Sequence, residues 1–272
     1  MKIADLRETD RYAPTTEPKI RSVLRRLRAE HFARELWHSY LAIDRLLNPL
    51  TPGDLEYWFP RVRKSLPAAP TTVLDVGGGE APYRTLLFDR VSRYVVLEVD
   101  WCRVSRQPGV EYVVGSGTTP VFAESSFEAI VLTQVLEHVA DPFLLVENCA
   151  MWLKSNGALF VSVPQYWHAH GWPSDYFRYT KYGIIEVARR ANLDVVDIWP
   201  LGGPCNLVYW AIELNFAKVL RLPVVRQLLA QPMRLVASAM DRVLFRNNES
   251  RVNPDTQGWM MVARKVSSNE VE

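Results

Sequence analysis

The sequence predicts an α/β protein with a doubly wound, mostly parallel sheet of seven strands and helices on both faces. From Thr72 to Trp199, short apolar segments alternate with segments of helical periodicity, a pattern typical of a parallel sheet covered by helices. Three glycines, Gly77 to Gly79, stand between the first apolar segment and the next helical one. A further apolar segment, Gly258 to Lys265, follows a long helical stretch and predicts the last strand.

Each predicted strand is a short apolar run bounded by polar or turn-forming residues. The seven strands are Thr72–Val76, Tyr94–Val99, Glu111–Val114, Ala129–Leu132, Ala158–Val163, Asp194–Trp199 and Gly258–Lys265. Helical periodicity predicts helices at Ile20–Leu47, Asp54–Ser65, Pro82–Phe88, Pro142–Leu153 and Lys181–Ala191. The stretch Leu207–Phe245 predicts two or more helices, broken near Pro223 and Pro232.

These elements divide the chain into five parts. The prediction is a flexible arm over 1–18, an N-terminal helical extension over 19–70, the sheet core over 71–200, a helical insertion over 201–257, and the last strand with a tail over 258–272. The insertion mixes apolar residues with arginines, which suits a lid or an oligomer contact such as a homodimer first, and peripheral membrane association second.

Composition excludes several classes of protein. The 32 basic residues nearly balance the 30 acidic ones, so the net charge of +2 gives no global field that would attract nucleic acid. The first residues are polar where a secretory signal would be apolar, and the longest apolar segment is too short to span a bilayer. The three cysteines lie far apart, without the spacing of a zinc site or a disulfide framework. A cytoplasmic location is therefore expected.

The glycine run predicts a binding site for a nucleotide-like ligand. It follows Asp75, the acidic residue near the end of the first predicted strand, and glycine lets the backbone turn tightly and approach a ligand closely. The dinucleotide pattern Gly-x-Gly-x-x-Gly is disfavoured, because Ala81 and Pro82 stand where its last glycine would be.

Three segments resemble the class I S-adenosylmethionine-dependent methyltransferases. They are Asp75-Val-Gly77-Gly-Gly79, the Leu-Glu-His-Val turn at 136–139, and the Asp-Tyr-Phe-Arg-Tyr-Thr segment at 175–180, which is similar to a signature of a subgroup that modifies small molecules or glycans. The resemblance covers about residues 72–200 and makes the core a cofactor-binding methyltransferase domain. It implies that Asp75 orders the loop and helps to hold the amino acid end of S-adenosylmethionine.

The resemblance also implies a set of cofactor-binding residues. Asp100 is the first choice for the ribose hydroxyls and Glu98 the second, because a carboxylate offers two acceptor oxygens about twenty residues beyond the loop. Ser116 and Glu128 stand where relatives have aspartates, so the contacts to adenine stay open. The full set is Asp75, Gly77, Gly78, Gly79, Tyr83, Glu98, Asp100, Trp101, Ser116, Gln134 and His138.

Histidines are the candidate catalytic bases, because methylation of a hydroxyl requires that its proton be removed. His170 is the leading candidate, and His168 and His138 follow. A structural role is the alternative for most of their neighbours, with Asp175 and Arg178 pairing to hold the loop. A cation bound by His168, His170 and Asp175 is a minor alternative, and the prediction is that no metal is bound.

The leading hypothesis is an enzyme that methylates oxygen, or less readily nitrogen, on a small molecule such as a sugar or another secondary metabolite. The second is a protein that binds the cofactor without transferring a methyl group. A nucleic-acid or protein methyltransferase is disfavoured, because no basic groove with interleaved aromatic residues is evident.

Overall fold

The computed structural model describes residues 71–84, 91–100, 106–219, 223–244 and 255–266, all within the unit formed by residues 49–272. The arm and helical extension predicted for residues 1–70, and the cofactor candidate Trp101, lie outside the described residues. The account below concerns the described part of the chain.

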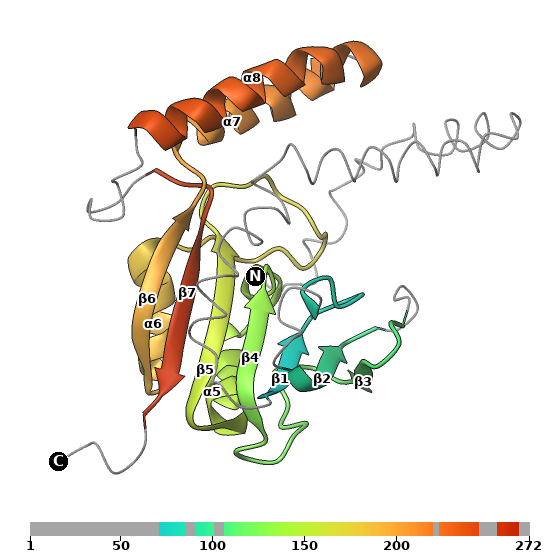
Figure 1. Ribbon diagram of the computed structural model, residues 1–272, viewed down its shortest axis with the longest axis vertical. Helices are drawn as coiled ribbons and strands as arrows, with labels where there is room; N and C mark the ends of the chain where they lie inside the picture. The colour runs from blue at the N-terminus through green and yellow to red at the C-terminus, as the bar shows by residue number, and fades with distance from the viewer. Residues whose placement is uncertain (1–70, 85–90, 101–105, 220–222, 245–254, 267–272) are drawn as a thin grey trace, which may run out of the picture. The chain divides into compact units, whose positions relative to one another are not determined.

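A seven-stranded sheet with the order β3-β2-β1-β4-β5-β7-β6 forms the centre of this part (Figure 1). Its strands are β1 Thr71–Val76, β2 Val91–Glu98, β3 Glu111–Val114, β4 Phe127–Thr133, β5 Leu153–Pro164, β6 Leu193–Leu201 and β7 Gly258–Lys265. The predicted number of strands is confirmed, and the neighbouring pairs among β1 to β5 are parallel.

The sheet is mixed, because β7 runs antiparallel to both of its neighbours, β5 and β6. The last residue of β6, Leu201, pairs with the first residue of β7, Gly258. The chain between them therefore leaves and re-enters the sheet at the same edge. A connection that does not cross the sheet requires an antiparallel return strand.

The described helices are η3 Leu136–His138, α5 Pro142–Trp152, α6 Lys181–Arg190, α7 Pro204–Val219 and α8 Pro223–Leu244. Side-chain caps fix the starts of two of them: Asp141 accepts the Leu144 N–H at 3.0 Å, and Thr180 accepts the Gly183 N–H at 3.1 Å. The helices predicted from Pro142 and Lys181 are confirmed.

In the helical insertion, the helix break predicted near Pro223 is confirmed and the break predicted near Pro232 is wrong. α8 begins at Pro223, where a missing N–H costs nothing, but it continues through Pro232. Contacts with α7 support α8: the Asp241 carboxylate accepts the backbone N–H groups of Cys205 and Asn206, each at 2.9 Å. Such packing outweighs the loss of one hydrogen bond at a proline. No helix in the described ranges has the length and apolar character needed to cross a membrane.

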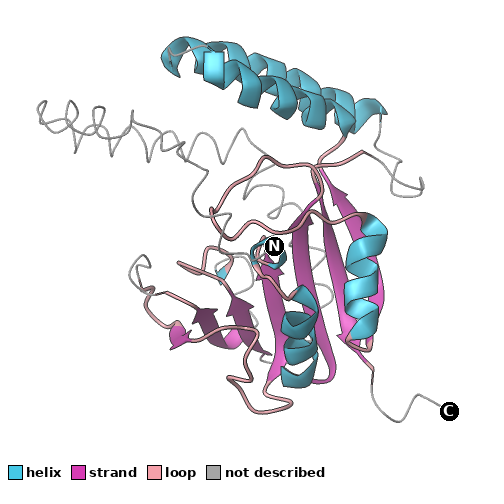
Figure 2. Cartoon of the chain, turned by 180° about the vertical axis from the view of Figure 1, so that it is seen from behind, coloured by secondary structure: helices cyan, strands magenta, loops and turns pink. Residues whose placement is uncertain are grey.

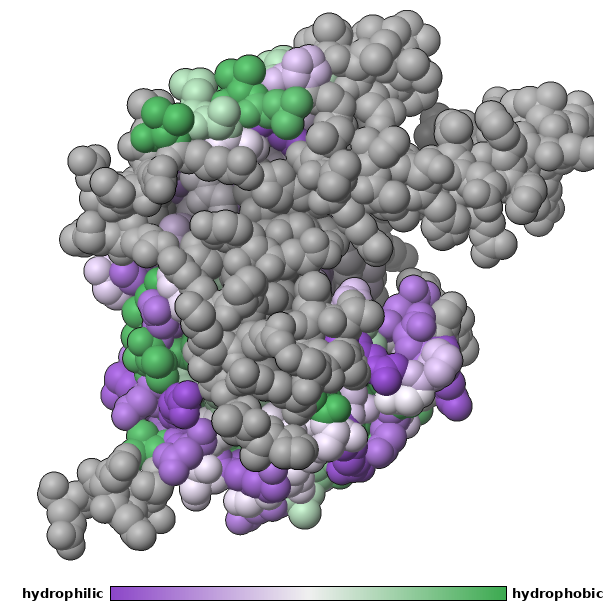
Figure 3. Space-filling model, in the orientation of Figure 1, coloured by the Kyte–Doolittle hydropathy of each residue, from purple (hydrophilic) through white to green (hydrophobic). Residues whose placement is uncertain are grey.

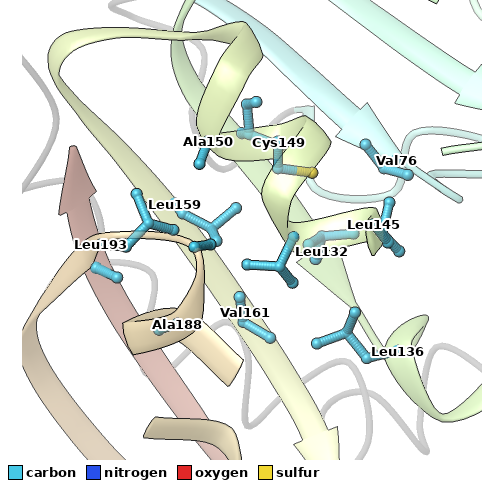
Figure 4. Close-up of a cluster of buried hydrophobic side chains, with 14 of the residues drawn as sticks. Val76, Leu132, Leu136, Leu145, Cys149, Ala150, Leu159, Val161, Ala188 and Leu193 are labelled. Atoms are coloured by element: carbon cyan, nitrogen blue, oxygen red, sulfur yellow. The ribbon is translucent and has the colours of Figure 1, made fainter. Parts of the chain in front are cut away.

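Alternate residues of the strands form two buried clusters, one on each face of the sheet. α5 and α6 cover the first face, where Leu132, Leu145 and Leu159 are at most 1% exposed (Figures 2 and 4). Burial of each such side chain contributes about 2 kcal/mol. The second face is buried too. The helix predicted at Pro82–Phe88 lies mostly outside the described residues.

Candidate active site

The glycine loop lies at the carboxyl edge of the parallel strands. It follows β1 directly, and the Gly77 N–H donates to the Leu97 carbonyl near the end of β2 at 2.8 Å. Gly79 has a φ of +51°, and no described atom apart from its chain neighbours lies within 4 Å of where its Cβ would be. The loop thus combines a left-handed turn with open space, as a ligand-binding loop requires.

Asp75 lies buried beneath this loop. Its Oδ2 accepts the Tyr94 hydroxyl at 2.6 Å, whereas its Oδ1 is buried and has no hydrogen-bond partner among the described residues. A Cβ on Gly78 would lie 2.4 Å from the Asp75 carboxyl, so the loop packs directly on this side chain. Burial raises the pKa of Asp75 to about 7, the Tyr94 hydrogen bond lowers it, and the charge of Glu98 adds to the rise.

The unpartnered Oδ1 and the open space at Gly79 fit a ligand that brings a hydrogen-bond donor. This is what the resemblance implied for S-adenosylmethionine, whose ammonium group is such a donor. Sequence reasoning did not assign Tyr94. Its position in β2, next to β1 in the sheet, was visible only once the strands were paired.

We predict that the stability of the folded protein depends on pH through Asp75. The carboxyl is protonated in the folded state up to a pKa of about 7 but ionises near 3.8 when unfolded, so its contribution is lost as pH rises from about 4 to 7. A shift of this size corresponds to at most about 4 kcal/mol. In Asp75→Asn, the free energy of unfolding should fall less over this interval than in the wild type. An equal fall in the free energy of unfolding between pH 5 and pH 8 in the two proteins, measured by urea titration, would contradict this prediction.

The other predicted cofactor residues occupy the same edge with varied surroundings. Asp100 is exposed, and Glu98 is half-buried and accepts the Val99 N–H at 2.9 Å. The Ser116 hydroxyl shares a 2.7 Å hydrogen bond with Thr118, within its own turn. Gln134 is exposed at the end of β4, and its amide donates to the Ser162 hydroxyl at 3.2 Å. Tyr83 is half-buried just after the glycine loop. Their roles toward the cofactor stay predictions.

Glu128 lies at the other edge of the sheet, at the amino end of β4. Its carboxylate accepts the Thr72 N–H at 2.8 Å and forms an ion pair with Lys154. Glu128, which stands where relatives have an aspartate, therefore joins the start of β4 to the starts of β1 and β5, away from the glycine loop.

Two of the three candidate bases meet at the carboxyl edge. His138, in η3, and His170, in the loop after β5, have their Nε2 atoms 3.2 Å apart. The turn carrying His138 adjoins the glycine loop, because a Cβ on Gly77 would lie 2.8 Å from Val135. The side chains of His138 and His170 are 27% and 30% exposed, so a substrate could reach them.

His168, the third candidate, lies beside this pair. Its ring is exposed, and its centroid is 5.9 Å from that of His170. Its backbone carbonyl, 3.2 Å from His170 Nδ1, helps to orient the His170 ring.

Glu137, which sequence reasoning did not assign, completes the group. Its side chain is fully buried, and its Oε1 lies 3.9 Å from His138 Nε2. Neither carboxylate oxygen has a hydrogen-bond partner among the described residues, and burial raises its pKa to about 7. The available signal was its place beside His138 in the Leu-Glu-His-Val turn.

Arg178 holds the loop that carries His170. Its guanidinium makes a bidentate pair with Asp175, at 2.7 and 2.9 Å, and donates to three backbone carbonyls of the loop. Asp175 also accepts the His170 N–H at 2.9 Å, and Arg178 holds the pKa of Asp175 far below its usual range. The structural role expected for this pair is confirmed.

The loop also docks on the turn that carries His138. The backbone N–H of Tyr176 donates to the Glu137 carbonyl at 2.8 Å, and the Tyr179 hydroxyl donates to the Leu136 carbonyl at 3.0 Å. These bonds, rather than sequence proximity, bring His138 and His170 together.

The fold and this edge define the class of protein. Residues 74–161 match a family model described as a methyltransferase domain. The core of the chain is therefore similar to S-adenosylmethionine-dependent methyltransferase domains.

Similar proteins fall in the same class. A ubiquinone biosynthesis O-methyltransferase from Xylella fastidiosa (strain 9a5c) is 31% identical over 125 residues, which are 43% of this chain and 49% of that protein. An uncharacterized methyltransferase from Mycobacterium sp. (strain JLS) is 38% identical over 78 residues, 27% of this chain and 31% of that protein. The chain thus spans half or less of these relatives.

Solved structures share the fold at low identity. The 1,6-didemethyltoxoflavin-N1-methyltransferase of Burkholderia thailandensis, solved with bound 1,6-didemethyltoxoflavin and S-adenosylhomocysteine, has a TM-score of 0.50 at 14% identity over 94% of this chain and 93% of that one. The [4+2]-cyclase SpnF has a TM-score of 0.53 at 15% identity over 78% of this chain and 81% of that one. Because one of these is named a cyclase, the fold alone does not define the reaction.

Proposed function

We propose that the protein transfers a methyl group from S-adenosylmethionine to a hydroxyl oxygen of a small molecule, most readily a sugar or another secondary metabolite. The observation that carries this proposal is the pair of partly exposed imidazoles, His138 on the turn beside the glycine loop and His170 in the loop after β5. The relatives named O-methyltransferases support oxygen as the acceptor atom.

The residues of the chain would have separate roles in binding the cofactor and in accepting the proton. The cofactor supplies an electrophilic methyl group when bound. Asp75 and the three glycines would hold its amino acid end, and Asp100 its ribose. His170 would accept the proton of the acceptor hydroxyl, because its Nδ1 faces the His168 carbonyl and its Nε2 is left to accept.

The test is a screen of hydroxylated small molecules with labelled S-adenosylmethionine, repeated on His170→Ala. We expect turnover to fall by about a hundredfold, the usual contribution of a general base, with affinity for S-adenosylhomocysteine unchanged in calorimetry. His168→Ala is the matched control and should lose far less. Undiminished turnover in His170→Ala would remove this residue as the base.

A cofactor-binding protein without transfer activity is the second candidate. The Ser116 hydroxyl favours it, because that group is bonded within its own turn rather than directed to adenine. Binding of S-adenosylhomocysteine without turnover across the whole screen would support this candidate over the enzyme.

We also propose that the exposed apolar side chains of the α7–α8 pair form a lid or an oligomer contact, with membrane association second. Val208, Ile212, Val236 and Val243 are 48% to 79% exposed there, and Figure 3 shows hydrophobic surface over these helices. A strictly monomeric protein in analytical ultracentrifugation would contradict the oligomer contact. The cytoplasmic location stays a prediction from the sequence.

A further inference from the structure

We propose that Glu137, His138 and His170 form a binding site for a divalent transition-metal ion. One ligand atom from each side chain can be chosen so that all lie within 4.8 Å of one another. Two imidazoles and one carboxylate are a ligand set that suits Zn²⁺, Fe²⁺ and similar ions rather than Mg²⁺ or Ca²⁺.

The hydrogen bonds of the two histidines support this site. His138 Nδ1 lies 2.5 Å from the Ser174 carbonyl, and His170 Nδ1 lies 3.2 Å from the His168 carbonyl. A carbonyl oxygen only accepts, so each Nδ1 carries the hydrogen and each Nε2 presents a lone pair. The two lone pairs then converge across 3.2 Å, an arrangement that a shared cation stabilises. A backbone carbonyl on the second ring nitrogen is the usual support of a metal-binding histidine.

Glu137 supplies the second, independent observation. Its side chain is 0% exposed, both of its oxygens lack a hydrogen-bond partner among the described residues, and one lies 3.9 Å from His138 Nε2. A buried carboxylate without a partner is costly, and such groups usually pair with a charge or coordinate a metal. An ion between Glu137 and the two imidazoles would provide the missing positive charge.

The distances are compatible with one ion. Two imidazole nitrogens at about 2.1 Å from the same tetrahedral ion are about 3.4 Å apart. The observed separation of the two Nε2 atoms, 3.2 Å, is close to this distance. The Glu137 carboxylate, with one oxygen 3.9 Å from His138 Nε2, would have to move closer to the ion.

The alternative set of His168, His170 and Asp175 fits less well. Both Asp175 oxygens accept hydrogen bonds from Arg178, and the described ligand atoms that lie within 4.8 Å of one another do not include one from His168. The sequence predicted that no metal is bound; the site proposed here uses His170 together with two residues from a different segment.

Three protein ligands leave at least one coordination position open, and the side chains of His138 and His170 are partly exposed to solvent. An oxygen of the acceptor could occupy it, and because His170 Nε2 would then be a ligand, the ion rather than His170 would activate that hydroxyl. This last step rests on the proposed function, whereas metal binding itself does not.

The test measures metal binding directly, on the full chain after treatment with a chelator. We expect one equivalent of Zn²⁺ to compete with a fluorescent zinc indicator, and one equivalent of Co²⁺ to give visible absorption bands. Glu137→Gln and His170→Ala should each weaken the affinity at least about tenfold, as loss of a ligand does. His168→Ala is the matched control and should remain within about twofold of the wild type.

Two results would overturn the site: no Zn²⁺ or Co²⁺ binding by the wild type, or equal weakening in His168→Ala and His170→Ala. Circular dichroism establishes whether each variant is folded. If His170→Ala does not fold, Glu137→Gln, whose side chain is nearly identical in size to the wild-type one, still tests the site. Calorimetry with S-adenosylhomocysteine separates the two proposals, because its failure would refute the proposed function while the metal titration still decides the site.

Discussion

Arg178→Ala is expected to lower methyl transfer by at least about a hundredfold while the sheet stays folded. Arg178 donates to Asp175 and to the carbonyls of Trp167, His168 and Phe177, so one side chain joins both ends of the loop. Without it, Asp175 loses its bidentate partner and His170 loses a fixed position opposite His138. A displacement of about 1 Å in a catalytic group can cost about a hundredfold in rate.

The control is Arg189→Ala. Arg189 also makes a two-pronged pair with a carboxylate, Glu186, but on the surface of α6, where its side chain is 71% exposed. Exposed pairs of this kind contribute little, so activity should be unchanged. Arg178→Lys should resemble Arg178→Ala, since lysine keeps the charge but loses the planar fork.

Hydrogen exchange provides a readout that does not depend on the reaction. The amides of His170 and Tyr176 should exchange faster in Arg178→Ala, while those of β4 and β5 stay protected. Full activity together with unchanged exchange would show that Arg178 does not hold the loop.

The strands were predictable because their signal is local. A short apolar run between turn residues is visible in the sequence, and all seven runs are strands. The direction of β7 was not predictable in the same way, because it depends on where the helical insertion returns to the sheet. The prediction of a helix break at Pro232 was wrong for a similar reason: contacts between α7 and α8 outweigh the local preference of proline against the helix interior.

In the candidate site, too, the local features were predictable and the contacts between distant segments were not. Asp75 and the glycines lie within five residues of one another, so sequence spacing was enough to predict the loop. His138 and His170 are 32 residues apart, and they meet because the loop is bonded to the turn of His138, is held by Arg178 and carries Gly171. Gly171 has a φ of +70°, and a Cβ there would lie 2.7 Å from the His138 ring. Sequence could name the histidines but could not separate His168 from the pair.

Gly78→Ala and Gly79→Ala are each expected to weaken cofactor binding strongly, for different reasons. A Cβ on Gly78 would lie 2.4 Å from the Asp75 carboxyl, which is buried and fixed by Tyr94. The loop must move, at a cost of about 1–3 kcal/mol in stability. A Cβ on Gly79 meets no described atom within 4 Å, so only its φ of +51° costs stability, by about 1 kcal/mol. Its methyl group would instead occupy the space proposed for the ligand.

Gly109→Ala is the matched control for backbone strain. Gly109 has a φ of +71°, and its added Cβ would meet the Arg84 guanidinium, which donates to the Pro108 carbonyl. Thermal unfolding should therefore show a loss of stability in Gly109→Ala at least as large as in Gly79→Ala, and a larger loss in Gly78→Ala than in Gly79→Ala. Calorimetry with S-adenosylhomocysteine should show at least about a hundredfold weaker binding in both loop variants and unchanged binding in Gly109→Ala. Wild-type affinity in Gly79→Ala would mean that the ligand does not use the open space of this loop.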